Sequence, residues 1–242
     1  MASLSSNTDG EITEFKSRLV HGLFTKPEQQ LARVREWNER FDWGISNGVF
    51  SDFERSIPSW HEERLVAVVL VPYLADKKRE DGTIMGGVER TFHELWTLAS
   101  AEQDASYLWR DYNKADSGGL RLPKGINHPC GRSGQTRLRW EVIHLGCHRN
   151  KRAFFVRSLT FAPNAGILAA AALHPQWVKS MDGENVPYVF LQGYDVGVPE
   201  LDWRMRSMPS LYFDRAAQEI GLSSRWSGEY GSDWAVPAFV LP

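Results

Sequence analysis

The sequence feature that most constrains the fold is an alanine-rich stretch, Asn164–Leu173, with the sequence NAGILAAAAL. A helix with so little polar surface has to be buried on most sides, because nearly every face that it could present to water is apolar. Asn164 can cap its first turn, and Pro175 prevents the helix from continuing much further. The apolar run is far shorter than the roughly 20 residues that span a bilayer. The stretch therefore predicts the central core helix of a globular protein.

Two strand-like segments precede this helix, and a third is expected from about Pro187 onward. Residues 137–146 alternate in hydrophobicity, as a half-buried strand requires. One face carries Leu138, Trp140, Val142 and His144, and the other carries Arg139 and Glu141. Residues 153–161 are aromatic and β-branched, which favours a return strand. The short basic connection between these two segments predicts a hairpin.

Further elements are predicted on either side of this region. Residues 65–74, LVAVVLVPYL, are apolar on both faces and predict a central strand covered on two sides. Apolar residues at helical spacing predict helices at 12–23, 31–41, 88–103 and 213–220. Thr25 and Glu28 have the spacing of a capping box before the second of these helices. The final segment, 235–241, predicts a strand interrupted by Pro237, which favours an edge position.

Together these elements predict an α+β fold of mixed α/β character. We expect a single mixed β-sheet that packs against the buried alanine-rich helix and against an N-terminal helical hairpin. No internal repeat and no low-complexity linker interrupts the chain. One globular domain is therefore expected over residues 1–242, with a flexible tail at 1–9 and a helical region at 10–58 packed on an α+β core at 60–242.

Composition narrows the classes of function. The formal net charge of −2 argues against general nucleic-acid or membrane-surface binding, because such binding normally needs an excess of basic residues. The 2 cysteines are too few for a disulfide scaffold. The first residues are polar and serine-rich, unlike a signal peptide, so the expected location is the cytoplasm. The 10 tryptophans are spread from Trp37 to Trp234, which favours anchors of a core over the lining of one groove.

Three stretches of the chain resemble a bacterial protein family of unknown function. These stretches are residues 67–74, 138–146 and 170–194, and the resemblance extends over roughly Trp60 to Pro242. The resemblance implies a soluble, single-domain bacterial protein. It implies no activity, ligand or catalytic residue.

Histidine and cysteine side chains gather between residues 128 and 148. The candidate metal ligands are His128, Cys130, His144, Cys147 and His148. Imidazole and thiolate groups suit zinc, but the paired C-x-x-C spacing of zinc ribbons is missing. Moreover, His144 shares a strand face with apolar residues, whereas Cys147 and His148 belong to a turn. We therefore expect no cofactor, with the cysteines acting as small hydrophobic residues, and we keep zinc as the alternative.

The same region supplies candidates for catalysis. A cysteine nucleophile needs a histidine base and a carboxylate that orients the histidine. The chain offers Cys130 and Cys147 as nucleophiles, His128, His144 and His174 as bases, and Glu141 and Asp182 as carboxylates. Asp182 precedes Gly183 in a predicted tight turn, at a strand end where α/β proteins often bind ligands. No signature of serine hydrolases, nucleotide-binding loops or zincins is present, so the sequence leaves open whether the protein is an enzyme.

A basic turn follows the first strand of the predicted hairpin. It contains His148, Arg149, Lys151 and Arg152, and Trp140 lies on the adjoining strand. The turn could bind a phosphate, a carboxylate or an acidic partner, although a charged tip that keeps a hairpin soluble is the more ordinary explanation. The long aperiodic segment 116–135 is a second candidate for function.

Two hypotheses about function follow. The first is a module that binds a small molecule or a protein in a pocket lined by tryptophan, tyrosine and the segment 116–135. The second is a hydrolase-like or transferase-like enzyme that uses the histidine and cysteine residues, with or without zinc. We favour the first, because no catalytic signature is present.

Overall fold

The computed structural model describes residues 22–59, 65–102, 120–121, 134–147, 164–191, 195–196, 207–226 and 233–239. Its helices are α2 (Pro27–Phe41), α3 (Asn47–Arg55), α4 (Gly87–Glu102), α6 (Asn164–Leu173) and α7 (Pro175–Lys179). Its strands are β1 (Val66–Tyr73), β2 (Lys77–Lys78), β3 (Ile84–Met85), β4 (Leu120–Arg121), β5 (Arg137–His144), β6 (Tyr188–Phe190), β7 (Asp195–Val196), β8 (Ser207–Asp214), β9 (Glu219–Trp226), β10 (Trp234–Ala235) and β11 (Ala238–Phe239). The fold is α+β, as the sequence predicts.

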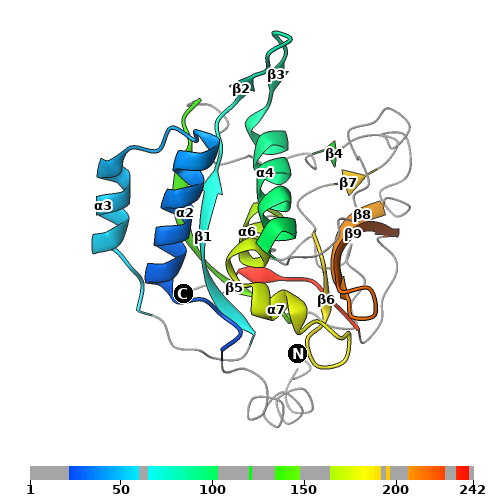
Figure 1. Ribbon diagram of the computed structural model, residues 1–242. Helices are drawn as coiled ribbons and strands as arrows, with labels where there is room; N and C mark the ends of the chain where they lie inside the picture. The colour runs from blue at the N-terminus through cyan, green and yellow to red at the C-terminus, as the bar shows by residue number, and fades with distance from the viewer. Residues whose placement is uncertain are drawn as a thin grey trace, which may run out of the picture.

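The first sheet has the strand order β1-β5-β11. β5 pairs antiparallel with both neighbours, and Val69 of β1 lies opposite Glu141 of β5. Helices α2 and α3 lie on one side of the β1–β5 pair, whereas α4 and α6 lie on the other (Figure 1). β1 is therefore buried almost throughout, as predicted for residues 65–74. It is not central, however, because among the described strands it pairs with β5 alone.

The remaining described strands form two further sheets, so the prediction of a single mixed sheet is wrong. The second sheet has the order β10-β6-β8-β7-β4, with β9 paired to β8, and it is mixed because β10 and β6 are parallel. The third is the β2–β3 hairpin, which projects beyond α4 (Figure 1). Hydrophobic periodicity identifies half-buried strands, but it does not specify which strands share hydrogen bonds.

Residues 213–220 form the tip of the β8–β9 hairpin and not the predicted helix. Phe213 lies opposite Ile220 across the hairpin. The Asp214 carboxylate accepts hydrogen bonds from the backbone N–H groups of Ala216 at 2.9 Å and Ala217 at 3.1 Å. Gln218 has a φ of 57°, which turns the chain back on itself. The apolar residues of this segment have a spacing that fits a helix, but they lie on two paired antiparallel strands.

The alanine-rich helix α6 is buried as predicted. The exposed fractions of its alanine, isoleucine and leucine residues between Ala165 and Leu173 are 0% to 4%. It lies between the first sheet and the second (Figure 1). Gly166 allows this close packing, because a Cβ atom there would lie 2.5 Å from Glu141 Oε2 and 2.8 Å from Ile143 Cδ1. The first sheet therefore turns its Glu141 and Ile143 face toward α6.

This packing corrects the predicted orientation of β5. The strand alternates as expected, but Glu141 is buried and Val142 is 36% exposed. The opposite face, with Trp140 and His144, is only half-buried. It is covered in part by α3, whose Phe53 ring lies 6.4 Å from the Trp140 ring. The face of β5 that is buried is thus the one against which α6 packs closely, whereas α3 covers the other face only in part.

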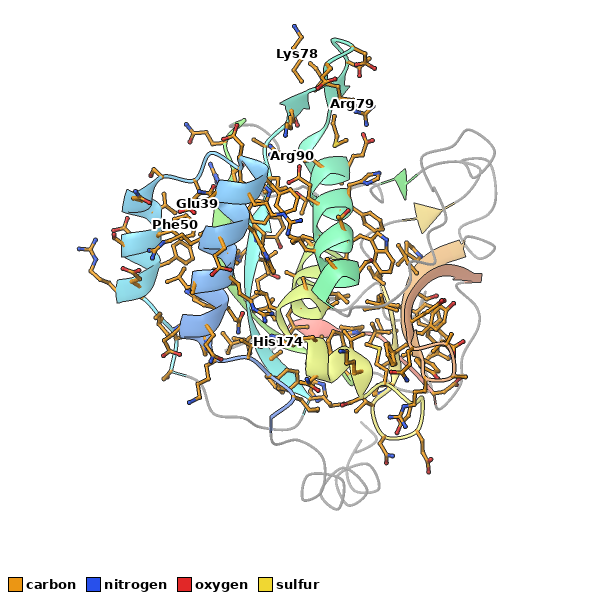
Figure 2. All side chains as sticks on the ribbon, in the orientation of Figure 1. Glu39, Phe50, Lys78, Arg79, Arg90 and His174 are labelled. Atoms are coloured by element: carbon orange, nitrogen blue, oxygen red, sulfur yellow. The ribbon has the colours of Figure 1, made fainter. Side chains whose placement is uncertain are left out.

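The start of α2 also differs from the prediction of a capping box. Its N-cap residue is Lys26, with Pro27 in the first turn and no side-chain cap. The Thr25 hydroxyl donates to the Leu173 carbonyl at 2.5 Å, and the Thr25 N–H donates to His174 Nδ1 at 3.0 Å. These bonds join the beginning of α2 to the end of α6, where His174 is labelled in Figure 2.

The predicted N-terminal helical hairpin is described only in part. Its second helix corresponds to α2, whereas residues 1–21 lie outside the described residues. Among the described tryptophans, Trp37, Trp43, Trp96, Trp177 and Trp234 are buried, as expected for anchors of a core. Within the described segments, the helices are too short or too polar to cross a bilayer.

Candidate functional site

A pocket of about 470 Å³ lies beside the second sheet. Its lining consists of Asp182, Tyr188, Tyr212, Phe213, Asp214, Arg215, Ala216 and Trp234. These residues come from the turn after α7, from β6, from β8 and its hairpin turn, and from the start of β10. The tertiary structure thus brings together residues that are far apart in the chain.

Three aromatic rings form the walls of this pocket. The Tyr188 ring lies 5.2 Å from the Trp234 ring and 6.2 Å from the Tyr212 ring, and it meets the latter edge-on at 84°. Trp234 is buried and belongs to a small hydrophobic cluster with Phe190 and Val236. Tyr188 and Tyr212 are half-buried and pack against that cluster. The two tyrosine rings are therefore supported from within and remain in part accessible.

Two glycines leave room for the tyrosine rings. Gly221 lies opposite Tyr212 in the β8–β9 pair, and a Cβ atom there would approach Tyr212 Cζ to 2.2 Å. Gly183 has a φ of 75°, as predicted for this turn, and a Cβ atom there would lie 3.0 Å from Tyr188 Cε2. Each ring lies over backbone that has no side chain. The orientation of both walls consequently depends on glycine.

Asp182 organises the turn that borders the pocket. Its Oδ1 accepts hydrogen bonds from the backbone N–H groups of Glu184 at 3.0 Å, Asn185 at 2.7 Å and Val186 at 2.9 Å. Burial acts to raise the pKa of Asp182, but hydrogen bonds from Asn185, Val186 and Glu184 outweigh this effect and lower it. The predicted candidate Asp182 is therefore an anion at neutral pH, and it has a structural role besides lining the pocket.

The charged groups around the pocket affect Tyr188. Its pKa is raised, first by burial and then by the negative charges of Asp182, Asp233 and Asp214, while the positive charge of Arg215 acts in the opposite direction. Arg215 Nη2 lies 3.6 Å from Asp182 Oδ2. Among the described residues, the charged groups that act on Tyr188 are thus three carboxylates and one guanidinium.

Glu141 is a second chemically unusual group, although it does not line the pocket. It is 4% exposed, and its Oε1 accepts a hydrogen bond from the Tyr73 hydroxyl. Its Oε2 has no hydrogen-bond partner among the described residues. Burial raises the pKa of Glu141 to about 7, against the opposing effects of Tyr73 and Arg139. The predicted catalytic candidate is therefore a carboxyl group that exchanges its proton near neutral pH.

The other described candidates have ordinary structural surroundings. His144 Nδ1 accepts from the Gly146 N–H at 3.2 Å, and Cys147 has a half-buried side chain and a carbonyl that accepts from the Val236 N–H at 3.0 Å. His174 is fully buried, and burial lowers its pKa to about 3, so it is neutral and unsuited to act as a base on a substrate. Trp140 packs against Phe53.

The predicted metal site and basic turn fall mostly outside the described residues. This holds for His128, Cys130, His148, Arg149, Lys151 and Arg152, and for most of the segment 116–135. Within the described ranges, no three histidine, cysteine, aspartate or glutamate residues gather in a way that could hold a metal ion. The zinc alternative and the basic-turn site therefore stay predictions.

Most residues of this pocket have no counterpart among the candidates predicted from the sequence. The sequence predicts a pocket lined by tryptophan, tyrosine and the segment 116–135, and its site candidates include Asp182 but not Tyr188, Tyr212 or Trp234. No local motif marks these rings, because they come from separate segments. The one local signal is the glycine at position 221, which takes its meaning only from the strand opposite.

Comparisons of the chain with protein-family models, with curated proteins and with solved structures found no match.

Proposed function

We propose that the protein is a binding module that holds a small molecule between Tyr188, Tyr212 and Trp234. The observation that carries the proposal is the convergence of these rings from separate segments on a pocket of about 470 Å³. This volume lies within the range of roughly 300–1,000 Å³ that is typical of small-molecule sites. The aromatic rings share the lining with the charged side chains of Asp182, Asp214 and Arg215. Tyrosine and tryptophan supply a large contact area at a small cost in conformational entropy.

The partial exposure of the two tyrosines supports this proposal. A ring that only fills a core would be covered on all sides, as Trp96 and Trp177 are at 0% exposure. Tyr188 and Tyr212 instead keep part of their surface accessible above a buried base of Phe190 and Trp234. The charged groups at the margin of the pocket can orient a ligand that enters it.

The proposal can be tested by NMR on the full chain. The indole N–H resonance of Trp234 is first assigned by its loss in Trp234→Phe. A mixture of small neutral, cationic and anionic organic compounds is then added. We expect at least one compound to shift this resonance, because the ring forms a wall of the pocket. If no compound shifts the Trp234 resonance of the folded protein, the proposed function is wrong.

A glycine variant tests whether the arrangement of the rings matters. Gly221→Ala should weaken binding by about tenfold or more, because the added methyl group displaces the Tyr212 ring. Gly48→Ala is the matched control, since a Cβ atom at that position meets only Ser46 Oγ, at 3.8 Å. Equal affinities for the two variants would contradict a role for Tyr212 in the pocket wall.

A further inference from the structure

The charge around the pocket favours one class of ligand. Asp182 and Asp214 line the pocket, and Asp233 immediately precedes the wall residue Trp234. The Asp233 carbonyl accepts a hydrogen bond from the Tyr188 N–H at 2.9 Å, which holds this aspartate beside the tyrosine wall. All three carboxylates act on Tyr188 through their negative charge. Among the described residues, the pocket is therefore surrounded by three carboxylates and one guanidinium group.

Arg215 compensates only one of these carboxylates. Its Nη2 donates to the Ser180 carbonyl at 3.1 Å and lies 3.6 Å from Asp182 Oδ2. Within the described residues, Asp214 and Asp233 form no ion pair, and Asp214 accepts only from backbone N–H groups of its own turn. No described side chain therefore neutralises the charge of these two aspartates.

The aromatic walls favour the same class. The face of an aromatic ring carries partial negative charge, so it attracts a cation and repels an anion. Tyr188 is tilted by 51° to Trp234 and meets Tyr212 at 84°. A group in the corner formed by three differently inclined rings can contact more than one of them. Methylated ammonium groups suit such a corner, because their charge is spread over methyl groups that pack on aromatic surface.

We propose that the pocket binds a small organic cation of the alkylammonium class. The cation would lie against Tyr188, Tyr212 and Trp234, and Asp214 and Asp233 would provide the opposing charge. This inference rests on the proposed function and adds the chemical class of the ligand to it.

The test compares choline with its neutral isostere, the alcohol in which carbon replaces the quaternary nitrogen. Both compounds are titrated into the full chain and followed by calorimetry and by the Trp234 indole resonance. Because the two share one shape and differ in charge, any difference in affinity reports on charge recognition. We expect choline to bind at least about tenfold more tightly than the isostere.

One aspartate variant and a matched control test which negative charge attracts the cation. Asp214→Asn keeps an oxygen that can accept from the N–H groups of Ala216 and Ala217, and it removes the negative charge. It should weaken choline binding by about threefold to tenfold and leave the isostere unaffected. Asp52→Asn is the matched control, because Asp52 lies on the exposed side of α3, pairs with Arg55 and does not line the pocket. This control should bind both compounds as the wild type does.

The outcomes separate the inference from the proposed function. Equal binding of choline and the isostere would overturn the cation inference and leave the small-molecule site intact. Failure of both compounds to bind would also overturn it, and the compound mixture would then decide separately whether the pocket binds anything. Choline affinity that is unchanged in both Asp214→Asn and Trp234→Leu would place choline elsewhere on the protein, which also contradicts the inference.

Discussion

At the scale of residues, the surroundings of Glu141 move the pKa of its carboxyl group close to neutral pH. Its carboxyl group lies between β1 and α6, where Tyr73 bonds one oxygen and the other has no partner in the described part of the chain. An ionised carboxylate in such a position loses hydration that one hydroxyl group cannot replace. The protonated form is therefore favoured, which explains the pKa of about 7.

This raised pKa predicts a pH-dependent loss of stability. Between the ordinary value of 4.5 and the folded value of about 7, the folded state binds more protons than the unfolded state. Glu141 thus contributes its full stabilisation below a pH of 4.5, the pKa in the unfolded state, and this stabilisation is lost as the pH rises through the folded pKa of about 7. The total loss in the free energy of unfolding is about 3 kcal/mol. Glu141→Gln cannot ionise, and its side-chain oxygen can still accept from Tyr73. We therefore expect Glu141→Gln not to show this loss when its free energy of unfolding in urea is compared between about pH 5 and about pH 8.

The comparison has to be made between the variant and the wild type, because His174 titrates in the opposite sense. Its pKa falls from 6.5 to about 3 on burial, so its contribution is full above the higher value and is lost as the pH falls toward the lower one. This contribution is common to both proteins and cancels in their difference. If the wild type and Glu141→Gln change equally with pH, the folded pKa of Glu141 is not raised.

At the scale of elements, the free edge of β1 is closed by side chains from two helices. Gln30 of α2 donates from Nε2 to the Val68 carbonyl at 2.8 Å and accepts at Oε1 from the Leu70 N–H at 3.0 Å. Farther along the same edge, the Thr91 hydroxyl accepts from the Leu74 N–H at 2.9 Å. Pro72 lies between these contacts and has no N–H group that needs a partner. An edge strand is thereby protected from pairing with another chain.

Replacing Gln30 by an apolar side chain of similar size should therefore destabilise the fold, because the hydrogen bonds to β1 are lost. Gln30→Leu removes these two hydrogen bonds and a third one, from Nε2 to the Thr25 carbonyl at 2.9 Å. It thereby leaves a buried carbonyl and a buried N–H group of β1 unsatisfied. We expect the free energy of unfolding to fall by about 2–4 kcal/mol in chemical denaturation. Gln29→Leu, on the exposed side of the same helix, is the control and should change it by less than about 0.5 kcal/mol. Similar small effects of both substitutions would show that the edge contacts add nothing to stability.

At the scale of the whole molecule, one hydrophobic cluster extends from α2 through β1, α4 and α6 to β6, β8 and β9. The final segment also connects the two larger sheets, because β10 pairs with β6 and β11 pairs with β5. Between these strands, the Val236 N–H donates to the Cys147 carbonyl at 3.0 Å. The helical layer, the first sheet and the pocket-bearing sheet therefore share one core.

A shared core predicts cooperative unfolding, and the single domain expected from the sequence stays a prediction that this unfolding tests. Urea unfolding followed by far-ultraviolet circular dichroism and by tryptophan fluorescence should give coincident transitions with one midpoint. The Trp234 indole resonance should disappear over the same range, because Trp234 belongs to β10, and the segment that contains β10 and β11 connects the two larger sheets. A separate, earlier transition of this resonance would show that the pocket region unfolds independently.

Elements whose surroundings are alike on every side can be predicted from the amino-acid sequence alone. The helix α6 could be predicted because its side chains are apolar all around, and β1 because both of its faces are apolar. The sequence predicts one final strand over residues 235–241, at an edge because Pro237 lacks an N–H group. The structure instead has two short strands, β10 and β11, which belong to different sheets and lie at the ends of the described strand orders. In each case the physical requirement is local, so no knowledge of the partner element is needed.

Features that depend on a partner element could not be predicted in this way, because the partner is brought into contact by the fold. Alternation along β5 shows that its faces differ, but the close packing of α6 at Gly166 decides that Glu141 is buried while Val142 is exposed. The spacing of residues 213–220 fits a helix, but pairing with the opposite strand makes the segment a hairpin. The pocket depends on contacts among Tyr188, Tyr212 and Trp234, which belong to three strands, and no periodicity within a single segment encodes such contacts.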